Sequence, residues 1–435
     1  MKRILLLTYY FPPCNLTASQ RPYSWARYLN HFGYYPIVIT RSWDREITDP
    51  RDVHRVSGHQ TEHEVCDGYE IYRLPYFPGW RDRLFTHGRG PIAGYFQRFL
   101  TLVEVFMQNV FWWAPAYRNL FSFAIEYAQK HRSELHGVLV TANPYTMFFL
   151  GYKVHKKTGL PWVADYRDDW TSRGWGHRFT RLPVLGILGR WLETRNEQKW
   201  LSTASGFVSI SPEYVKSIGM HVNRPGEVVY NGYVDEDFAR FRQTFNNEVF
   251  TVVYNGTLIP MQNIEMFLSA WIKMVDMHGK NIRMKLFFLG TAYDQKQKQR
   301  IEKYLFGYED YFEVSGRMPR DEVIRKQSEA HLLLMVAYGA VKGSPGTKIF
   351  DYIACHKPVV LCPSDHDVIE QILTSSELAM IANDKQEAED VLELAIAEFQ
   401  ATGNVKRNPN KEILERFSRF NQTRVLSEAL NKFLP

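Results

Sequence analysis

Apolar and polar positions divide the chain into two successive series of short strands and helices. Runs of β-branched and other apolar residues predict strands in the first half at 3–8, 35–40, 69–74, 136–141, 161–165 and 206–210. The alternation restarts after residue 228, with strands predicted at 250–256, 284–290, 311–315, 332–337, 358–362 and 378–382. Helical spacing predicts helices at 20–32, 263–277, 294–305, 320–328, 347–354, 366–374 and 385–400. Strands that alternate with helices form parallel sheets, so the pattern predicts an α/β fold with two doubly wound, Rossmann-like domains.

The border between the predicted domains lies in a linker at 223–248, where apolar periodicity lapses and Asn, Pro and Gly gather. A length of 435 residues also exceeds one typical core. We place an N-terminal domain at 1–226 and a C-terminal domain at 227–410. The last helical pattern, within 411–435, is expected to pack back on the N-terminal domain.

Residues 75–135 interrupt the alternation with an insertion rich in aromatic side chains. Polar residues recur there every three or four positions and leave a wide apolar face: Gln97, Thr101, Glu104 and Gln108. Arginines lie nearby at Arg81, Arg83, Arg89 and Arg98. Such a helix either lies in a membrane interface or packs on the first sheet as a core helix. We favour the core helix, with some of the aromatic residues exposed, because a stripe with this spacing is more often core.

The composition is that of an ordinary globular protein and excludes several classes. The net charge of +6 is too small to indicate a nucleic-acid partner, although it is compatible with anionic substrates or a lipid surface. The four cysteines show no C-x-x-C spacing, which argues against a zinc site and suits a reducing compartment. The N-terminus reads as a buried strand rather than a signal peptide, and no apolar run is long enough to span a membrane.

The strongest candidate for a ligand site is the segment 343–352, in which a loop of small residues leads into a short helix. Backbone N–H groups at a helix start favour an anion such as a diphosphate, and Lys348 adds a full positive charge there. Asp351 follows on the same helix face, where it can accept hydrogen bonds from the vicinal hydroxyls of a ribose. A diphosphate beside a ribose describes a nucleotide-activated donor.

Ligands of open α/β sheets bind beyond the carboxyl ends of the strands, which makes the loop 8–19 a second candidate. Its run of Tyr, Phe and Pro is rigid and aromatic, and Thr17 and Ser19 open a helix that carries Arg21. The loop can line an acceptor or donor pocket, or it can be an ordinary capped turn.

The strand predicted at 161–165 ends in a cluster of charge beside a tryptophan: Asp165, Arg167, Asp168, Asp169 and Trp170. The carboxylates can bind sugar hydroxyls, and one of them, Asp165 or Asp168, can take a proton from an attacking hydroxyl. A local Arg–Asp network that only fixes the loop is an equally good interpretation of any single residue.

Two further loops follow predicted strands of the second half. After the first of these strands come Asn255, Gly256 and Thr257, where the glycine lets the backbone approach a phosphate and the threonine can donate to it; alternatively, the glycine serves only the turn. After the third come Arg317 and Met318, at a strand end suited to a flat base; alternatively, Arg317 is a solvated surface charge.

Other motifs argue against certain kinds of site or enzyme and assign no function. Asp365 and Asp367 spell D-x-D, but they precede a helical pattern, and we interpret them as capping residues rather than metal ligands. The fingerprints G-x-G-x-x-G and G-x-x-x-x-G-K-[ST] of dinucleotide and P-loop enzymes are absent.

Taken in order, these segments resemble family 4 of the glycosyltransferases, retaining enzymes of the GT-B fold, whose two Rossmann-like domains face each other across a cleft. The R-D-x-W sequence at 167–170 is similar to a loop of a bacterial branch that makes surface polysaccharides. The other matching segments run along nearly the whole chain: 10–13, Arg21, 209–211, 231–235, 255–258, Gly316 and 348–358.

The resemblance implies donor binding by the C-terminal domain and acceptor binding by the N-terminal domain, with no cofactor and no obligatory metal. Asp351 matches the second glutamate of the family's Glu-seven residues-Glu motif and would hold the ribose. Lys348 would face the diphosphate as a catalytic cation, together with Ser344, Gly346 and Thr347. Arg317 and Met318 would border the base.

The chain departs from the family pattern at three places. Gly343 replaces the first glutamate of the motif, Thr257 and Gln262 replace two cations, and the first loop lacks its paired glycines. Losing one donor to a developing negative charge can cost ~3 kcal/mol, which weakens a claim of high activity.

The sequence therefore predicts a hexosyltransferase-type glycosyltransferase that moves a sugar from a UDP- or GDP-sugar to a glycan or lipid-linked acceptor in polysaccharide biosynthesis. Two alternatives stay open: a catalytically silent relative that binds glycans or serves assembly, and a nucleotide-sugar epimerase. We expect a cytoplasmic protein with peripheral contact to the inner face of the cell membrane.

Overall fold

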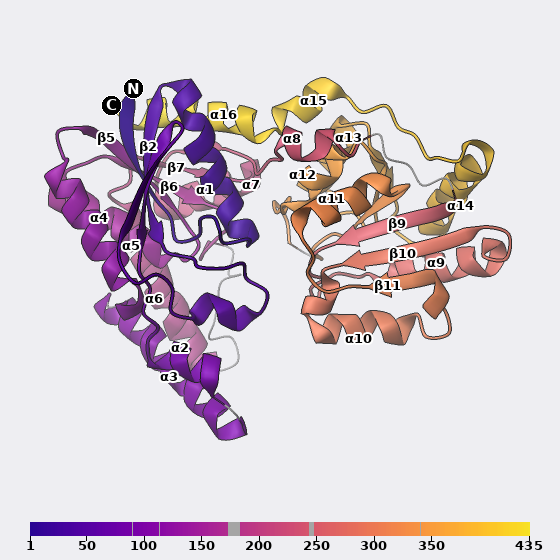
Figure 1. The fold of residues 1–435 in the computed structure, drawn as a ribbon, viewed down its shortest axis with the longest axis horizontal. Coiled ribbons are helices and arrows are strands. Elements are labelled where there is room, and N and C mark those ends of the chain that lie inside the picture. Colours follow the sequence, from indigo (N-terminus) through magenta and orange to yellow (C-terminus); the bar gives the residue numbers. More distant parts are fainter. Residues whose placement is uncertain (89, 113, 173–182, 243–247, 340) are drawn as a thin grey trace. The chain divides into compact units, whose positions relative to one another are not determined.

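The computed structural model describes residues 1–88, 90–112, 114–172, 183–242, 248–339 and 341–435. The chain divides into two compact units, the first made of residues 1–230 with 422–435 and the second of residues 231–421 (Figure 1). Each unit holds a largely parallel sheet covered by helices, which confirms the predicted α/β class with two Rossmann-like bodies. Arg89 and residues 243–247 of the predicted linker lie outside the described residues.

The first unit has an eight-stranded sheet in the order β3-β4-β2-β1-β5-β6-β7-β8. Its strands are β1 (Lys2–Leu7), β2 (Tyr34–Arg41), β3 (Glu62–Cys66), β4 (Tyr69–Leu74), β5 (Leu135–Thr141), β6 (Trp162–Tyr166), β7 (Gly206–Ser209) and β8 (Gly226–Val228). Neighbouring strands are parallel except for β3 and β4. The apolar pattern missed β3, an exposed edge strand, and β8, which is only three residues long.

The helices of the first unit are α1 (Thr17–Tyr28), α2 (Trp80–His87), α3 (Gly90–Phe111), α4 (Arg118–Lys130), α5 (Thr146–Thr158), α6 (Pro183–Leu201) and α7 (Pro212–Val222), and most of α16 (Arg419–Phe433) joins them. Both faces of the sheet are buried. Leu5 and Leu7 pack with α4 and α5, whereas Ile4 and Leu6 pack with α1 and α16. This two-sided burial explains why β1 reads as an unbroken apolar run.

The second unit has a six-stranded parallel sheet in the order β11-β10-β9-β12-β13-β14. Its strands are β9 (Val249–Asn255), β10 (Arg283–Leu289), β11 (Phe312–Val314), β12 (Leu332–Met335), β13 (Val359–Leu361) and β14 (Ala379–Ile381). Its helices are α8 (Asp235–Ala239), α9 (Glu265–His278), α10 (Gln295–Tyr304), α11 (Arg320–Glu329), α12 (Lys348–Ala354), α13 (Val368–Ser375), α14 (Lys385–Thr402) and α15 (Lys411–Arg416).

The strand order places a topological switch point in each sheet. β1 lies between β2 and β5, and β9 lies between β10 and β12, so in each sheet the chain first builds outward on one side of the central strand and then crosses to its other side. Ligands of open α/β sheets bind at the carboxyl ends of the strands at such a point. The loops after β1, β5, β9 and β12 are therefore the places where a site is expected.

The helical pattern predicted at 411–433 forms two helices rather than one. The backbone of Tyr233 donates to Phe417 O at 3.3 Å and accepts from Arg419 N at 2.8 Å. These bonds draw the chain out of helical geometry between α15 and α16.

Helix α3 overturns the core-helix interpretation of the insertion. Its polar stripe, with Gln97, Thr101 and Gln108, faces a pocket of the first unit, whereas its apolar stripe, with Phe96 and Phe99, faces outward. The interpretation was wrong because the space between α3 and the sheet is a polar cavity, so the polar side chains are the ones turned inward. The expectation that some of the aromatic residues stay exposed is confirmed.

Candidate functional site

A left-handed glycine ends the central strand of the second sheet. Gly256 follows β9 with a φ of 95°, a conformation that only glycine adopts without strain. Its N–H donates to Leu289 O at 2.8 Å, and its carbonyl accepts from Thr291 Oγ1 at 2.9 Å. The chain therefore turns sharply at the switch point, and Gly256 itself has no side chain that shields its backbone.

Lys348, the first residue of α12, lies against this turn. Its Nζ is 3.9 Å from the centroid of the Tyr254 ring, and 3.8 Å from where a Cβ on Gly256 would be. The Nζ is buried and has no hydrogen-bond partner among the described residues. Burial lowers the pKa of Lys348 to about 7. A buried ammonium group is costly unless an anion meets it, so the surroundings of this Nζ suit an anion.

The loop before α12 is fixed by a side chain and a backbone carbonyl of the next βα connection. The Gly343 N–H donates to Asp367 Oδ2 at 2.5 Å, and Lys342 Nζ donates to the carbonyl of Asp365. Gly346 has a φ of 66°, and a Cβ there would lie 2.7 Å from the hydroxyl of Tyr338. Ser344 and Thr347 are half-buried beside it.

The D-x-D pair is not arranged as a metal site. Asp365 caps α13, since its carboxylate accepts from Ile369 N at 2.8 Å and from Glu370 N at 3.0 Å. The capping interpretation is thus confirmed for Asp365, while Asp367 holds the loop before α12.

Asp351 is held by an arginine that the sequence reasoning missed. Arg320 contacts both of its carboxylate oxygens at 3.3 and 3.4 Å, and also contacts Asp237 at 3.3 Å. Asp351 raises the pKa of Arg320 above its ordinary value, against the effect of burial. These long contacts fix the direction of the Asp351 carboxylate, and each oxygen keeps a further lone pair for a hydroxyl donor.

The remaining predicted donor residues lie around the same strand ends. Asn255 N donates to the Tyr352 hydroxyl at 2.8 Å, and Thr257 is exposed. Gln262, which replaces a cation of the family pattern, is fully buried and donates to Val336 O at 2.7 Å. It ties the loop after β9 to the end of β12.

Arg317 and Met318 follow β11, two strands away from β9 in the sheet. The Arg317 side chain is exposed and lies over the Tyr293 ring at 5.4 Å, and Met318 is half-buried. No hydrogen bond or ion pair within the described chain joins Arg317 to Lys348 or Asp351.

In the first unit, Arg21 and Asp165 form a buried ion pair between α1 and β6. Arg21 Nη2 donates to Asp165 Oδ1 at 2.9 Å, and Arg21 Nη1 donates to Tyr230 O at 2.8 Å. Burial raises the pKa of Asp165 and lowers that of Arg21, and each charge opposes the shift of the other. The geometry favours the interpretation of Asp165 as part of an Arg–Asp network.

Of the other residues of this cluster, Trp170 lines the pocket described below, and Asp168 contacts the pocket residue Asn143. Asp168 is exposed and accepts from Asn143 Nδ2 at 3.2 Å. Trp170 stacks on Tyr145 with ring centroids 4.8 Å apart. Arg167 is half-buried, and its Nε has no hydrogen-bond partner in the described part of the chain.

The loop after β1 is held by its own side chains. Ser19 Oγ donates to Cys14 O at 2.6 Å and to Leu16 O at 2.8 Å, while Thr17 begins α1 and is exposed. For Ser19 this favours the interpretation of an ordinary turn.

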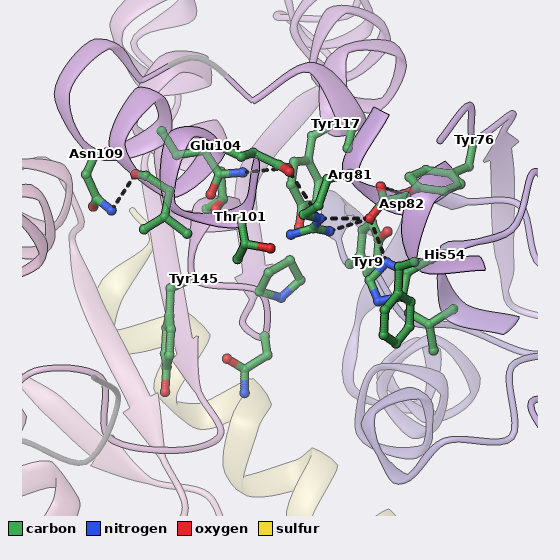
Figure 2. A pocket seen from close by; sticks show the side chains of 18 of the residues that line it. Tyr9, His54, Tyr76, Arg81, Asp82, Thr101, Glu104, Asn109, Tyr117 and Tyr145 are labelled. Carbon is green, nitrogen blue, oxygen red and sulfur yellow. Dashed lines mark hydrogen bonds and ion pairs between the residues drawn. The ribbon is translucent and has the colours of Figure 1, made fainter. Parts of the chain in front are cut away.

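A pocket of about 530 Å³ opens at the switch point of the first sheet, between the loops after β1 and β5 and helices α2 and α3 (Figure 2). Tyr9 and Tyr10 come from the first loop, and Asn143 and Tyr145 from the second. Helix α3 adds a polar wall of Gln97, Thr101, Glu104, Gln108 and Asn109. Aromatic rings and hydrogen-bonding side chains together suit a polyhydroxylated ligand.

Charged side chains order one wall of this pocket. Figure 2 shows Arg81 between Glu104 and Asp82, which it contacts at 3.2 and 2.5 Å. Asp82 also meets His54 Nδ1 at 2.9 Å and accepts from the Tyr76 hydroxyl at 2.7 Å. Burial opposes ionisation of Asp82, but these partners together hold its pKa well below the usual range. Tyr9 and Tyr10 belong to the loop 8–19, for which a pocket was one of the two interpretations. Sequence reasoning missed the walls from α2 and α3, although the polar stripe on α3 was their signal.

Among the described helices, none combines the length and the apolar character that crossing a membrane requires. Within the same residues, no group of three or more His, Cys, Asp or Glu side chains is arranged to hold a metal ion.

Residues 249–397, from β9 into α14, match the family described as Glycosyl transferases group 1. A search of curated protein sequences finds no match to this chain. The structure is similar to that of sucrose-phosphate synthase from Thermosynechococcus elongatus, at 13% identity over 99% of both chains, with a TM-score of 0.64.

Two further solved structures resemble the chain. HepE of Anabaena in complex with UDP and glucose has 13% identity over 99% of this chain and 100% of that one, with a TM-score of 0.59. The alpha,alpha-trehalose-phosphate synthase (UDP-forming) from Burkholderia vietnamiensis has 10% identity over 99% and 97%, with a TM-score of 0.61. Identities this low show the fold alone, which is GT-B. With the family match in the second unit, they support a glycosyltransferase of that fold.

Proposed function

We propose that this chain is a retaining glycosyltransferase that moves a hexosyl group from a nucleotide-sugar to a glycan or lipid-linked acceptor in polysaccharide biosynthesis. The observation that carries the proposal is the buried Nζ of Lys348, which has no hydrogen-bond partner in the described chain and lies beside Gly256 at the switch point of the second sheet. A diphosphate bound there neutralises the ammonium group and occupies the place where open α/β sheets bind ligands.

The donor is proposed to be a UDP-sugar, with a GDP-sugar as the second choice. Solved relatives of this fold are complexed with UDP and UDP-glucose or bear the name UDP-forming. In this chain Lys348 faces the diphosphate together with Ser344, Gly346 and Thr347. Asp351, directed by Arg320, accepts hydrogen bonds from the ribose. Arg317 and Met318 border the base.

The reaction forms a bond between an acceptor oxygen and the anomeric carbon, and it breaks the bond from that carbon to the diphosphate. The acceptor proton passes to the leaving diphosphate. Lys348 stabilises the negative charge that grows on the diphosphate as the bond breaks. The pocket beneath α3 is proposed to hold the acceptor, with Asp168 at its rim among the residues that bind hydroxyls.

The catalytically silent alternative rests on the two lost cations at Thr257 and Gln262. Gln262 is buried in a structural role, so it provides no phosphate contact. Calorimetry with UDP, GDP, UDP-glucose and GDP-mannose distinguishes a silent relative from an active glycosyltransferase, because a silent relative binds none of these nucleotides tightly. Mass spectrometry of products from mixed donors and lipid-extract acceptors then tests transfer. Conversion of the donor without any acceptor would instead indicate an epimerase.

A further inference from the structure

Helix α3 carries an exposed apolar stripe along its outer side. Six large side chains at helical spacing form it: Ile92, Tyr95, Phe96, Phe99, Val103 and Phe106. Ile92 is 83% exposed and Tyr95 is 70% exposed. A stripe of this size on one helix is unusual for a surface that faces only water.

The apolar surface continues onto the neighbouring helices. Helix α6, which packs against α3, exposes Ile187, Leu188 and Trp191, and Trp80 at the start of α2 is also exposed. In Figure 1, α2 and α3 lie beyond the end of the first unit's sheet.

The charges on the same helices have one sign. Every exposed charged side chain in the described parts of α2, α3 and α6 is basic: Arg83, Arg98, Arg190, Arg195 and Lys199. The carboxylates of these helices are turned inward, for example Asp82 and Glu104 in the ion pairs of the pocket. Phe, Tyr and Trp beside Arg and Lys, with no exposed carboxylate, match the interface of an anionic bilayer.

We propose that this face of α2, α3 and α6, called the docking face below, binds the surface of a membrane that contains anionic lipids. A second copy of the chain is a poorer occupant, because two docking faces would bring like charges together. The opposite side of α3 lines the pocket, so docking places the pocket directly beneath the lipid surface. If the proposed function holds, a lipid-linked acceptor reaches the pocket without leaving the bilayer.

The proposal is tested by sedimenting the full chain with vesicles of phosphatidylcholine, alone or with about one third phosphatidylglycerol. We expect the chain to sediment with the anionic vesicles and to bind less at high ionic strength. The double variant Phe96→Ser, Phe99→Ser should lose about tenfold or more in vesicle affinity. Phe306→Ser removes a phenylalanine that is still more exposed, at 82%, from the second unit and should leave vesicle binding unchanged.

Circular dichroism verifies that the double variant is folded. Arg98→Glu tests the contribution of charge alone to vesicle binding, and Lys303→Glu in the second unit is its control. Equal vesicle binding by the double variant and wild type overturns the proposal, as does absence of binding to anionic vesicles. Concentration-dependent dimers that the double variant abolishes would identify a second copy as the occupant and would also overturn it. Nucleotide affinity without vesicles reports on the proposed function separately.

Discussion

The ammonium group of Lys348 lies 3.9 Å from the centroid of the Tyr254 ring, buried and without a hydrogen-bond partner in the described chain. The ring face provides partial compensation for the charge, but a cation–π contact is weaker than an ion pair with an anion. The pKa of about 7 reflects this incomplete environment. The charged form of Lys348 would therefore gain from an anion at this place, which is the role that we propose for the diphosphate.

The low pKa of Lys348 makes donor binding depend on pH. Burial favours the neutral amine, so at pH 8 most of the free protein lacks the proton that a diphosphate needs. We expect affinity for UDP-glucose to fall by up to about tenfold per pH unit above 7. Calorimetry in buffers of different ionisation enthalpy should show proton uptake on binding. The same uptake in Lys348→Met would contradict the assignment.

The same pKa affects stability. Its value in the folded protein is lower than in the unfolded chain, so the unfolded chain holds the extra proton between pH 7 and the ordinary range of a lysine. Stability should therefore rise with pH across that window. Denaturant unfolding of wild type and Lys348→Met at several pH values measures the free energy of unfolding as a function of pH. The same dependence on pH in the two proteins would show that another group is responsible.

Gly256 should not tolerate a side chain. Its φ of 95° makes Gly256→Ala cost about 1–2 kcal/mol of folding free energy. The added Cβ would lie 3.7 Å from Lys348 Cε, an ordinary contact, so strain rather than a clash is the cause. Gly316→Ala is the control, because nothing lies within 4 Å of its Cβ position and its φ is not in the left-handed region. Similar thermal unfolding of both variants would contradict the argument.

The buried pair of Arg21 and Asp165 predicts a loss of stability rather than a purely catalytic defect. Asp165→Asn leaves a buried guanidinium without its counter-ion, which should cost about 3–5 kcal/mol. The double variant Arg21→Met, Asp165→Leu should regain part of this, and both should keep their affinity for UDP. An Asp165→Asn protein with an unchanged melting temperature and no transfer would instead identify Asp165 as a catalytic carboxylate.

If the pocket beneath α3 holds the acceptor, a change in its lining should alter acceptor binding without altering donor binding. Thr101→Phe fills the pocket and should lower transfer at least about tenfold through the acceptor KM, with nucleotide affinity unchanged. Leu102→Phe alters the next residue, which faces outward, and should leave the acceptor KM as it is. Steady-state kinetics with varied acceptor measures both. Equal acceptor KM values for the two variants would exclude this pocket as the acceptor site.

Much of the fold was predictable because strands buried on both faces produce apolar runs that few other structures imitate. The runs at 35–40 and 284–290 became β2 and β10 with ends shifted by only one residue. The exposed strand β3 has no such signal. On α3 the stripe of Thr101 and Glu104 was found, but periodicity alone does not tell which face meets the solvent.

The candidate site was predictable only in part. The sequence indicated Lys348 because a lysine after a loop of small residues is a local feature. It did not indicate Arg320, which reaches Asp351 from another helix, nor Tyr254 beneath the lysine. Such partners come from different strand ends, and their pairing depends on the order of strands in the sheet.

Titration calorimetry of UDP-glucose into wild type and Lys348→Met tests the central claim most directly. Lys326→Met is the matched control, since Lys326 also lies over an aromatic ring, 4.6 Å from Phe287, but away from the switch point. Loss of a charged hydrogen-bond donor predicts a decrease of about 10- to 100-fold in affinity for Lys348→Met and none for Lys326→Met. Equal affinity of wild type and Lys348→Met would contradict the account.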